Sequence, residues 1–303
     1  MLATAIGISI TATTAAILVG AISRAPRAHP FPAHGWLGIL ALGAAEALMF
    51  RRVEPVATYF TPLVWSAWIL IADGAVLAVT GRSRLHDAPL TLARMALLSI
   101  PLWLIFEAYN FRLRNWTYVG VPREWAAALL GYAWSFATIT PAIFETSDLA
   151  QAVLPPLLCK PWKISPRVER MIAATGAVCL IVPLAAPQRI AAHLFVLVWI
   201  GFFLLLDPLN RRLGLPSFLG DLSEGFARRV CGFLLSGWIC GWLWEFWNNW
   251  AAAKWHYTFP MFQQWKIFEM PAPGYLGFLP FALDCFAMYV IAAWLVGWIY
   301  SIR

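Results

Sequence analysis

The sequence predicts an all-α, polytopic integral membrane protein with about nine transmembrane helices, built as two tandem parallel repeats of three to four helices. Hydrophobic residues make up 61% of its 303 residues and charged residues only 12%, whereas a soluble domain carries about 25% charged residues. The mean hydropathy is +0.69, and short basic groups separate the long apolar runs. Because no soluble domain fits between these runs, we expect residues 1–303 to form a single membrane domain.

Nine apolar runs approach the roughly 20 residues that a helix needs to cross the hydrocarbon core. The runs are 2–23, 36–50, 58–80, 91–110, 126–145, 171–187, 190–207, 229–250 and 276–301. The second run is short and the sixth contains Pro183, so eight spans are also compatible with the pattern. The first run lacks a basic segment before it, which favours a retained helix over a cleaved signal peptide.

The basic residues predict the orientation of the chain. In the nine-span arrangement, the odd-numbered loops carry 12 Lys and Arg residues and the even-numbered loops carry 8. The positive-inside rule then places the N-terminus outside and the C-terminus in the cytoplasm, and we expect a bacterial inner membrane. Because the net charge of +7 comes from these short groups, it predicts topology signals and no nucleic-acid partner.

Two segments of the chain resemble each other. Residues 107–122 read EAYNFRLRNWTYVGVP and residues 245–260 read EFWNNWAAAKWHYTFP. Both begin with Glu-x-x-Asn, and a shift of one residue aligns their Trp-x-Tyr pairs. Upstream of each, a Leu-Val-Trp triplet precedes an Asp, and downstream 141–145 (PAIFE) resembles 280–284 (PFALD).

These matches predict a duplicated unit, with the first repeat in 36–146 and the second in 171–301. Chance similarity between Trp-rich membrane segments is the alternative. An offset of four spans makes the repeats parallel, related by an axis along the membrane normal. Both Glu-x-x-Asn motifs would then end on the same face of the membrane, near the outside.

Carboxylates inside membrane spans are unfavourable unless they face a cavity, a partner or the interior of the bundle. The chain places seven acids in or at its apolar runs: Glu46, Asp73, Glu107, Glu145, Asp207, Glu245 and Asp284. Asp207 and Glu145 stand at predicted span ends, where solvation is the simplest interpretation, and Asp73 can cap a helix or pair with Arg82 or Arg84. Glu245, Asn248 and Asn249 share one helix face because they follow i, i+3, i+4 spacing.

Glu245, Glu107 and Asp284 are the candidate catalytic carboxyl groups, and Asn248 and Asn110 are expected to orient them. The candidate substrate-binding residues around them are Trp244, Trp247, Trp255, Tyr257, Trp116, Tyr118 and Asn249. Burial favours a neutral, proton-donating carboxyl, and indole faces stabilise cations. This combination suits protonation of an isoprenoid alkene, shelter of the carbocation and loss of a proton. The alternatives are carboxyl–amide bonds that join helices and aromatic anchors at the membrane interface.

The outer loop after residue 250 carries further polar groups. Lys254 and His256 flank Trp255 and either meet lipid phosphates or extend to the interface as such side chains commonly do. The segment 263–273 is too short to span the membrane, and we expect an interfacial or re-entrant piece that covers the Glu245 region, with Glu269 either in the site or solvated.

Several site motifs are missing from the sequence. The five histidines are scattered, and the sequence contains no DDxxD, P-loop, GxGxxG or GxSxG pattern. We therefore expect no cofactor and no metal site. A redox-neutral reaction or a non-enzymatic role fits this inventory better than nucleotide, flavin or serine-hydrolase chemistry.

The order of motifs in the second half resembles a known family. Asp207 precedes the Trp255-x-Tyr257 pair, which precedes 267–271 (IFEMP) and 277–281 (GFLPF). In tandem membrane units this order is similar to the bacterial and fungal lycopene cyclase domain of carotenoid biosynthesis. The resemblance implies a lycopene-cyclase-like isomerase or cyclase, in which carboxylates drive ring closure of a carotenoid end group without net redox change.

The leading hypothesis is therefore a membrane-embedded enzyme that acts on an isoprenoid, a carotenoid or another lipid by acid–base chemistry, with membrane lipids and a hydrophobic ligand as its partners. A first alternative is a non-catalytic subunit or pigment- and lipid-binding scaffold that assembles with other membrane subunits. A second is a proton-coupled transporter. Acids that converge on one cavity would favour the enzyme, and acids that pair singly between helices would favour the scaffold.

Overall fold

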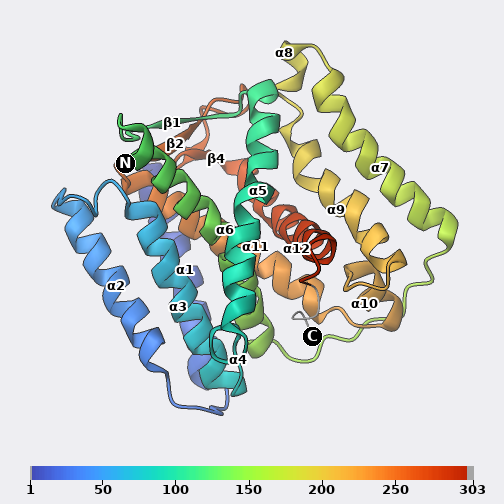
Figure 1. Ribbon diagram of the computed structural model, residues 1–303, viewed down its shortest axis with the longest axis horizontal. Coiled ribbons are helices and arrows are strands. Elements are labelled where there is room, and N and C mark those ends of the chain that lie inside the picture. The colour runs from blue at the N-terminus through green and yellow to red at the C-terminus, as the bar shows by residue number, and fades with distance from the viewer. Residues whose placement is uncertain (1, 299–303) are drawn as a thin grey trace.

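The computed structural model describes residues 2–298 as a helical bundle with a few short strands (Figure 1). The long helices are α1 (Leu2–Arg24), α2 (Ala33–Phe50), α3 (Phe60–Thr80), α5 (Pro89–Leu113), α6 (Trp125–Val153), α7 (Pro166–Ala185), α9 (Phe195–Arg212), α11 (Arg228–Trp250) and α12 (Phe278–Leu295). The short elements are α4 (Arg84–Asp87), α8 (Gln188–Ala191), α10 (Phe218–Glu224), β1 (Trp116–Val119), β2 (Lys254–Tyr257), β3 (Lys266–Ile267), β4 (Met270–Pro271) and the 3-10 helix η1 (Ala272–Gly277).

Eight helices in the described part of the chain are long and apolar enough to cross a membrane, so the chain is an integral membrane protein. The sequence left two runs uncertain as spans, 36–50 because it is short and 171–187 because it contains a proline. They correspond to α2 and α7, and both helices are long and apolar enough to cross a membrane. The helix outside this set is α9, whose 18 residues include Asp207, Arg211 and Arg212. The count of nine spans therefore stays a prediction.

The helices pack in matching pairs around a central contact between α6 and α11. In the N-terminal half α2 packs on α3 and α3 on α6, and in the C-terminal half α7 packs on α9 and α9 on α12. Helices α11 and α12 are the most buried spans, whereas α1 and α2 lie at the periphery with most of their apolar surface uncovered. Such lipid-facing surface needs no protein cover in a bilayer, since lipid tails are as apolar as the side chains.

The structure also contains two short antiparallel ribbons, which the all-α prediction did not include. Strand β1 pairs antiparallel with β2 so that Trp116 lies opposite Tyr257 and Tyr118 opposite Trp255. The two Trp-x-Tyr pairs of the sequence are therefore neighbours in space. Figure 1 shows β1 and β2 together at one end of the bundle, with α4 and α10 at the other.

The acids at the α4 and α10 end are buried rather than solvated. Asp73 accepts hydrogen bonds from Ser83 Oγ and Leu85 N, both at 2.8 Å. Asp207 accepts them from Phe218 N at 2.7 Å and Leu219 N at 2.9 Å. Both carboxylates are fully buried. Through these hydrogen bonds, each one fixes the turn that leads into the next short helix.

The expected solvation of Asp207 and Glu145 is wrong. Glu145 is fully buried and lies 3.3 Å from Arg84 Nη1, which also contacts Asp148. Of the two alternatives expected for Asp73, the structure shows capping rather than pairing with Arg82 or Arg84. Pairing and capping both supply the partners that a buried carboxylate requires.

Helices α11 and α12 approach each other closely at glycines. A Cβ on Gly237 would lie 2.2 Å from the carbonyl oxygen of Phe278, and one on Gly241 would lie 2.4 Å from the Phe278 ring. These distances leave no room for a methyl group, so the two glycines determine how tightly α12 packs on α11.

Substitution of Gly237 by Ala should lower the midpoint of thermal unfolding in detergent, because overpacking of this kind costs about 1–3 kcal/mol. The matched control is Gly43→Ala in α2, where no atom lies within 4 Å of the added Cβ. That change should leave the midpoint unchanged or raise it, since Ala favours helix by about 0.5–1 kcal/mol over Gly. Equal midpoints for the two variants would contradict the packing described.

Candidate functional site

Each Glu-x-x-Asn motif forms a Tyr–Glu pair with its own strand. The Tyr118 hydroxyl donates to Glu107 Oε1 at 2.5 Å, and the Tyr257 hydroxyl donates to Glu245 Oε1 at 2.8 Å. Glu107 lies on α5 and Glu245 on α11, directly before β1 and β2. Because β1 and β2 are paired, the strands bring both Tyr–Glu pairs to the same end of the bundle.

The two asparagines hold the strands rather than the carboxyl groups. Asn248 Nδ2 donates to Trp255 O and its Oδ1 accepts from Trp255 N, both at 3.0 Å. Asn110 makes the same two bonds with Trp116, at 2.9 Å and 3.2 Å. The expected role of orienting the acids is therefore indirect: each asparagine fixes a strand, and the strand positions the tyrosine.

The two glutamates differ in their surroundings. Glu107 is half-buried and accepts two further hydrogen bonds, from Trp103 Nε1 at 2.8 Å and Trp116 Nε1 at 3.2 Å. Glu245 is fully buried, and its Oε2 has no hydrogen-bond partner of good geometry within the described residues. Three donors thus converge on Glu107 Oε1, whereas the hydroxyl of Tyr257 donates to Glu245 Oε1.

The two strand tyrosines are neutral phenols over the physiological range. Burial, and after it the neighbouring glutamate, holds the pKa of Tyr118 and that of Tyr257 well above the ordinary value. A neutral phenol is required for either residue to donate its proton in a hydrogen bond.

A cavity of about 130 Å³ lies beside the two Tyr–Glu pairs. It is bordered by β1 and β2 and reaches inward to α3, α5, α6, α9, α11 and α12. Its aromatic lining residues are Trp65, Trp103, Trp116, Trp199, Trp244, Trp255, Tyr59, Tyr118, Tyr132, Tyr257, Phe136, Phe278 and Phe281. A cavity of about 150 Å³ with an apolar lining binds benzene, so a ring-sized apolar group fits this space.

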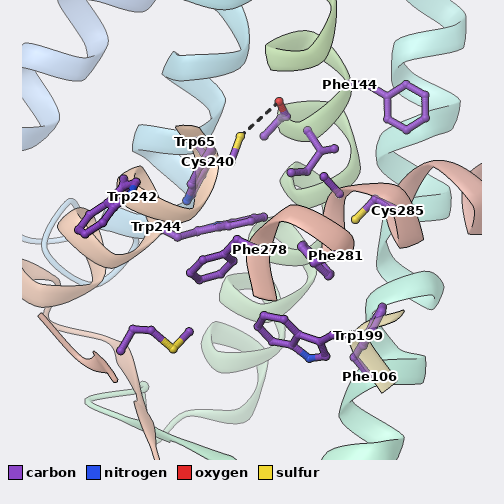
Figure 2. Close-up of a cluster of buried hydrophobic side chains, with 14 of the residues drawn as sticks. Trp65, Phe106, Phe144, Trp199, Cys240, Trp242, Trp244, Phe278, Phe281 and Cys285 are labelled. Carbon is purple, nitrogen blue, oxygen red and sulfur yellow. Dashed lines mark hydrogen bonds between the residues drawn. The ribbon is translucent and has the colours of Figure 1, made fainter. Parts of the chain in front are cut away.

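The inner wall of the cavity belongs to the aromatic core. Figure 2 shows Trp244, Phe278, Phe281 and Trp199 gathered between α11 and α12, with Trp65 close to Trp244. The ring centroids of Trp65 and Trp244 are 4.9 Å apart, and those of Trp199 and Phe281 are 5.6 Å apart. Such packing gives the cavity an apolar inner wall.

Two polar atoms of lining residues have no partner within the described residues. They are the indole Nε1 of Trp65, a residue with only 1% exposure, and the hydroxyl of Thr61. A buried donor without an acceptor is unfavourable, so a ligand with an acceptor group could satisfy it. In the sequence, Trp65 is the last residue of the Leu-Val-Trp triplet that marks the repeat, and it was not predicted as a site residue. Its position eight residues before a buried Asp is the signal that could have identified it.

The predicted site residues divide into two groups. The cavity is lined by Trp116, Tyr118, Trp244, Trp255 and Tyr257. Glu107 and Glu245 lie behind their tyrosines and do not line it.

The remaining predicted residues lie elsewhere. Trp247 packs on Trp65 and donates to Glu46 Oε1 at 3.2 Å, and Asn249 does not line the cavity. Asp284 accepts from Phe203 N at 2.5 Å between α12 and α9. The structure therefore does not bring this third carboxyl to the cavity wall.

The described residues contain no group of three or more His, Cys, Asp and Glu side chains that could hold a metal ion. Comparisons with models of protein families, with curated proteins and with solved structures find no significant match.

Substitution of Asn248 by Ala should destabilise the protein by about 1–3 kcal/mol, because it leaves the backbone N–H and C=O of Trp255 without the amide. Asn249→Ala is the matched control, since the side chain of Asn249 forms no hydrogen bond with the described residues and only its backbone oxygen accepts one. Thermal unfolding in detergent measures both variants. Equal effects would show that the amide of Asn248 does not hold β2.

Alkaline pH should weaken the folded state through the strand tyrosines. Because their pKa is raised on folding, their contribution to the free energy of unfolding is fully present below about pH 10, the value of free Tyr, and is lost as the pH rises further. Tyr257→Phe should be less stable at pH 8 and should lose less stability between pH 9 and pH 11.5. Unfolding midpoints measured across this range test the prediction, and parallel curves for the two proteins would contradict it.

Proposed function

We propose that the chain is a membrane-embedded enzyme that acts on an isoprenoid, carotenoid or other lipid by redox-neutral acid–base chemistry in the aromatic cavity. The observation that carries the proposal is the pair of tyrosine hydroxyls in the cavity lining, each hydrogen-bonded to a glutamate behind it. The size of the cavity suits a ring-sized end group. The resemblance of the motif order to the lycopene cyclase domain supports a terpenoid substrate.

The two Tyr–Glu pairs suit opposite proton transfers. Glu245 Oε2 accepts no hydrogen bond of good geometry within the described residues, so this carboxyl group can hold a proton. In the acid step the protonated oxygen turns to Tyr257 and donates to its hydroxyl oxygen, while the Tyr257 hydroxyl gives its own proton to a substrate alkene and leaves a carbocation. Glu107 acts as the base: the Tyr118 hydroxyl, which already donates to Glu107 Oε1, gives it its proton and takes one from the cation. One proton enters the substrate and one leaves it, so the product is an isomer of the substrate.

The lining supports the charged intermediate of this reaction. The faces of Trp116, Trp244 and Trp255 stabilise a cation by their quadrupoles, and the apolar wall keeps out water that would capture it. Asn110 and Asn248 act as positioning residues, because they fix the strands that carry the tyrosines.

A non-catalytic lipid- or pigment-binding scaffold is the second candidate. It is favoured by one observation: neither glutamate lines the cavity, and each accepts hydrogen bonds that join a helix end to its strand. In this case the cavity would hold its ligand without changing it.

We also infer that the chain is a duplicated unit with parallel halves, whose N-terminus lies outside a bacterial inner membrane and whose C-terminus lies in the cytoplasm. Matched hydrogen bonds support the duplication. Asp73 accepts from Leu85 N and Asp207 from Leu219 N, in both cases 12 residues further on. The equivalent Asn and Tyr bonds of the two Glu-x-x-Asn motifs add to this correspondence.

Lipid and pigment profiles of cells that express the protein or its variants test the proposed reaction. Glu245→Gln and Tyr257→Phe should reduce the product by roughly 100-fold or more, the usual effect of losing a general acid, and Glu107→Gln should do the same through loss of the base. Glu224→Gln, an exposed change on α10, is the control and should keep the wild-type profile. Unchanged profiles from normally folded Glu245 and Glu107 variants would rule out the enzyme and leave the scaffold.

A further inference from the structure

The charges around the aromatic cavity are not balanced. Lys254 is the single charged residue among the described residues that line the cavity. Its Nζ lies 3.9 Å from Glu269 Oε1 and 3.4 Å from the backbone oxygen of Asn249, near the end of α11. The first of these contacts is an ion pair and the second a long hydrogen bond. Because an ammonium group has three donors, one remains for another acceptor.

Glu269 is shared among three basic side chains. Its Oε2 lies 2.8 Å from His256 Nδ1 and 3.6 Å from Lys266 Nζ, in addition to the contact of Oε1 with Lys254. Two ammonium groups therefore face one carboxylate, which leaves a net positive charge even when the imidazole is neutral. The side chains of Lys254, Lys266 and Glu269 are only 23%, 27% and 17% exposed, so solvent screens this charge less than it would at an open surface.

The backbone fixes this basic cluster, formed by Lys254, His256, Lys266 and Glu269, at the strand end of the cavity. Lys254 and His256 belong to β2, which is paired with β1. Lys266 begins β3, and Glu269 lies in the turn between β3 and β4, which are paired through Ile267 and Met270. The cluster is thus built from two ribbons, and both are anchored by backbone hydrogen bonds.

We propose that the cavity takes an amphiphile whose anionic headgroup, a phosphate or a carboxylate, binds at Lys254 and Lys266 while its apolar chain enters among the aromatic rings. The inference rests on the proposed function and names its substrate class. Since Lys254 itself lines the cavity, a headgroup in contact with its ammonium group leaves the attached chain at Trp255 and Tyr257, the next cavity-lining residues of the same strand.

Binding of farnesyl phosphate and of farnesol to the purified full chain, in an uncharged detergent, tests the proposal through quenching of tryptophan fluorescence. The wild-type protein should bind the phosphate roughly tenfold more tightly or better, as expected for charge-assisted hydrogen bonds. Lys254→Gln should remove most of this advantage and leave farnesol binding within about twofold, whereas Lys254→Arg should retain it. Lys163→Gln, an exposed change in the loop before α7, is the control and should alter neither affinity.

Competition separates the possible sources of the headgroup. Inorganic phosphate that displaces farnesyl phosphate but not farnesol would support a headgroup subsite, and displacement by phosphatidylglycerol would identify a membrane lipid as its natural occupant. Equal affinities for the phosphate and the alcohol, in wild type and Lys254→Gln alike, would overturn the headgroup assignment and leave the proposed reaction intact. Failure of both compounds to bind would overturn both.

Discussion

The need to satisfy every backbone polar group near a bilayer underlies the organisation of this protein. Helices satisfy their own N–H and C=O groups, but a chain that leaves a helix near hydrocarbon must find other partners. Here the segments after α5 and α11 pair with each other as β1 and β2. Asn110 and Asn248 bond the remaining N–H and C=O groups of Trp116 and Trp255. One polar side chain per helix end thus completes a ribbon that neither half could form alone.

The geometry of the site follows from that ribbon. Once β1 and β2 are in register, Tyr118 and Tyr257 project onto the glutamates of the helices that precede them, and the same strands form one border of the aromatic cavity. The opposite border is set by close helix packing, which Gly237 permits by bringing α11 against the backbone of α12 at Phe278. The ribbon and the helix pair are held by separate contacts, and the cavity is the space that remains between them.

The two halves share matching hydrogen bonds, but the surroundings of their glutamates and of the cavity differ. Glu107 is half-buried and accepts tyrosine and indole donors at Oε1, while Glu245 is fully buried and accepts from Tyr257 at Oε1. Near α9 the ring of Phe195 stacks on Phe259 at 4.7 Å, and a Cβ on Gly277 would meet Trp199 at 2.9 Å. Aromatic packing thus leaves the cavity in contact with α9 at Trp199, whereas several residues of α3 and α6 line it.

The sequence by itself determined the membrane class, most helices, and the Glu-x-x-Asn faces, because composition and helical periodicity are local properties. It also identified five of the residues that line the cavity, four through the spacing shared by its two aromatic segments and Trp244 through its place next to Glu245. The tertiary structure decided that the Trp-x-Tyr pairs form strands, that the tyrosines stand between the glutamates and the cavity, and that Asp284 lies against α9. It also decided that Trp65, Trp103 and Trp199 belong to the wall. Strand pairing and side-chain direction depend on contacts between residues far apart in the chain, and no local pattern encodes which buried acid meets which neighbour.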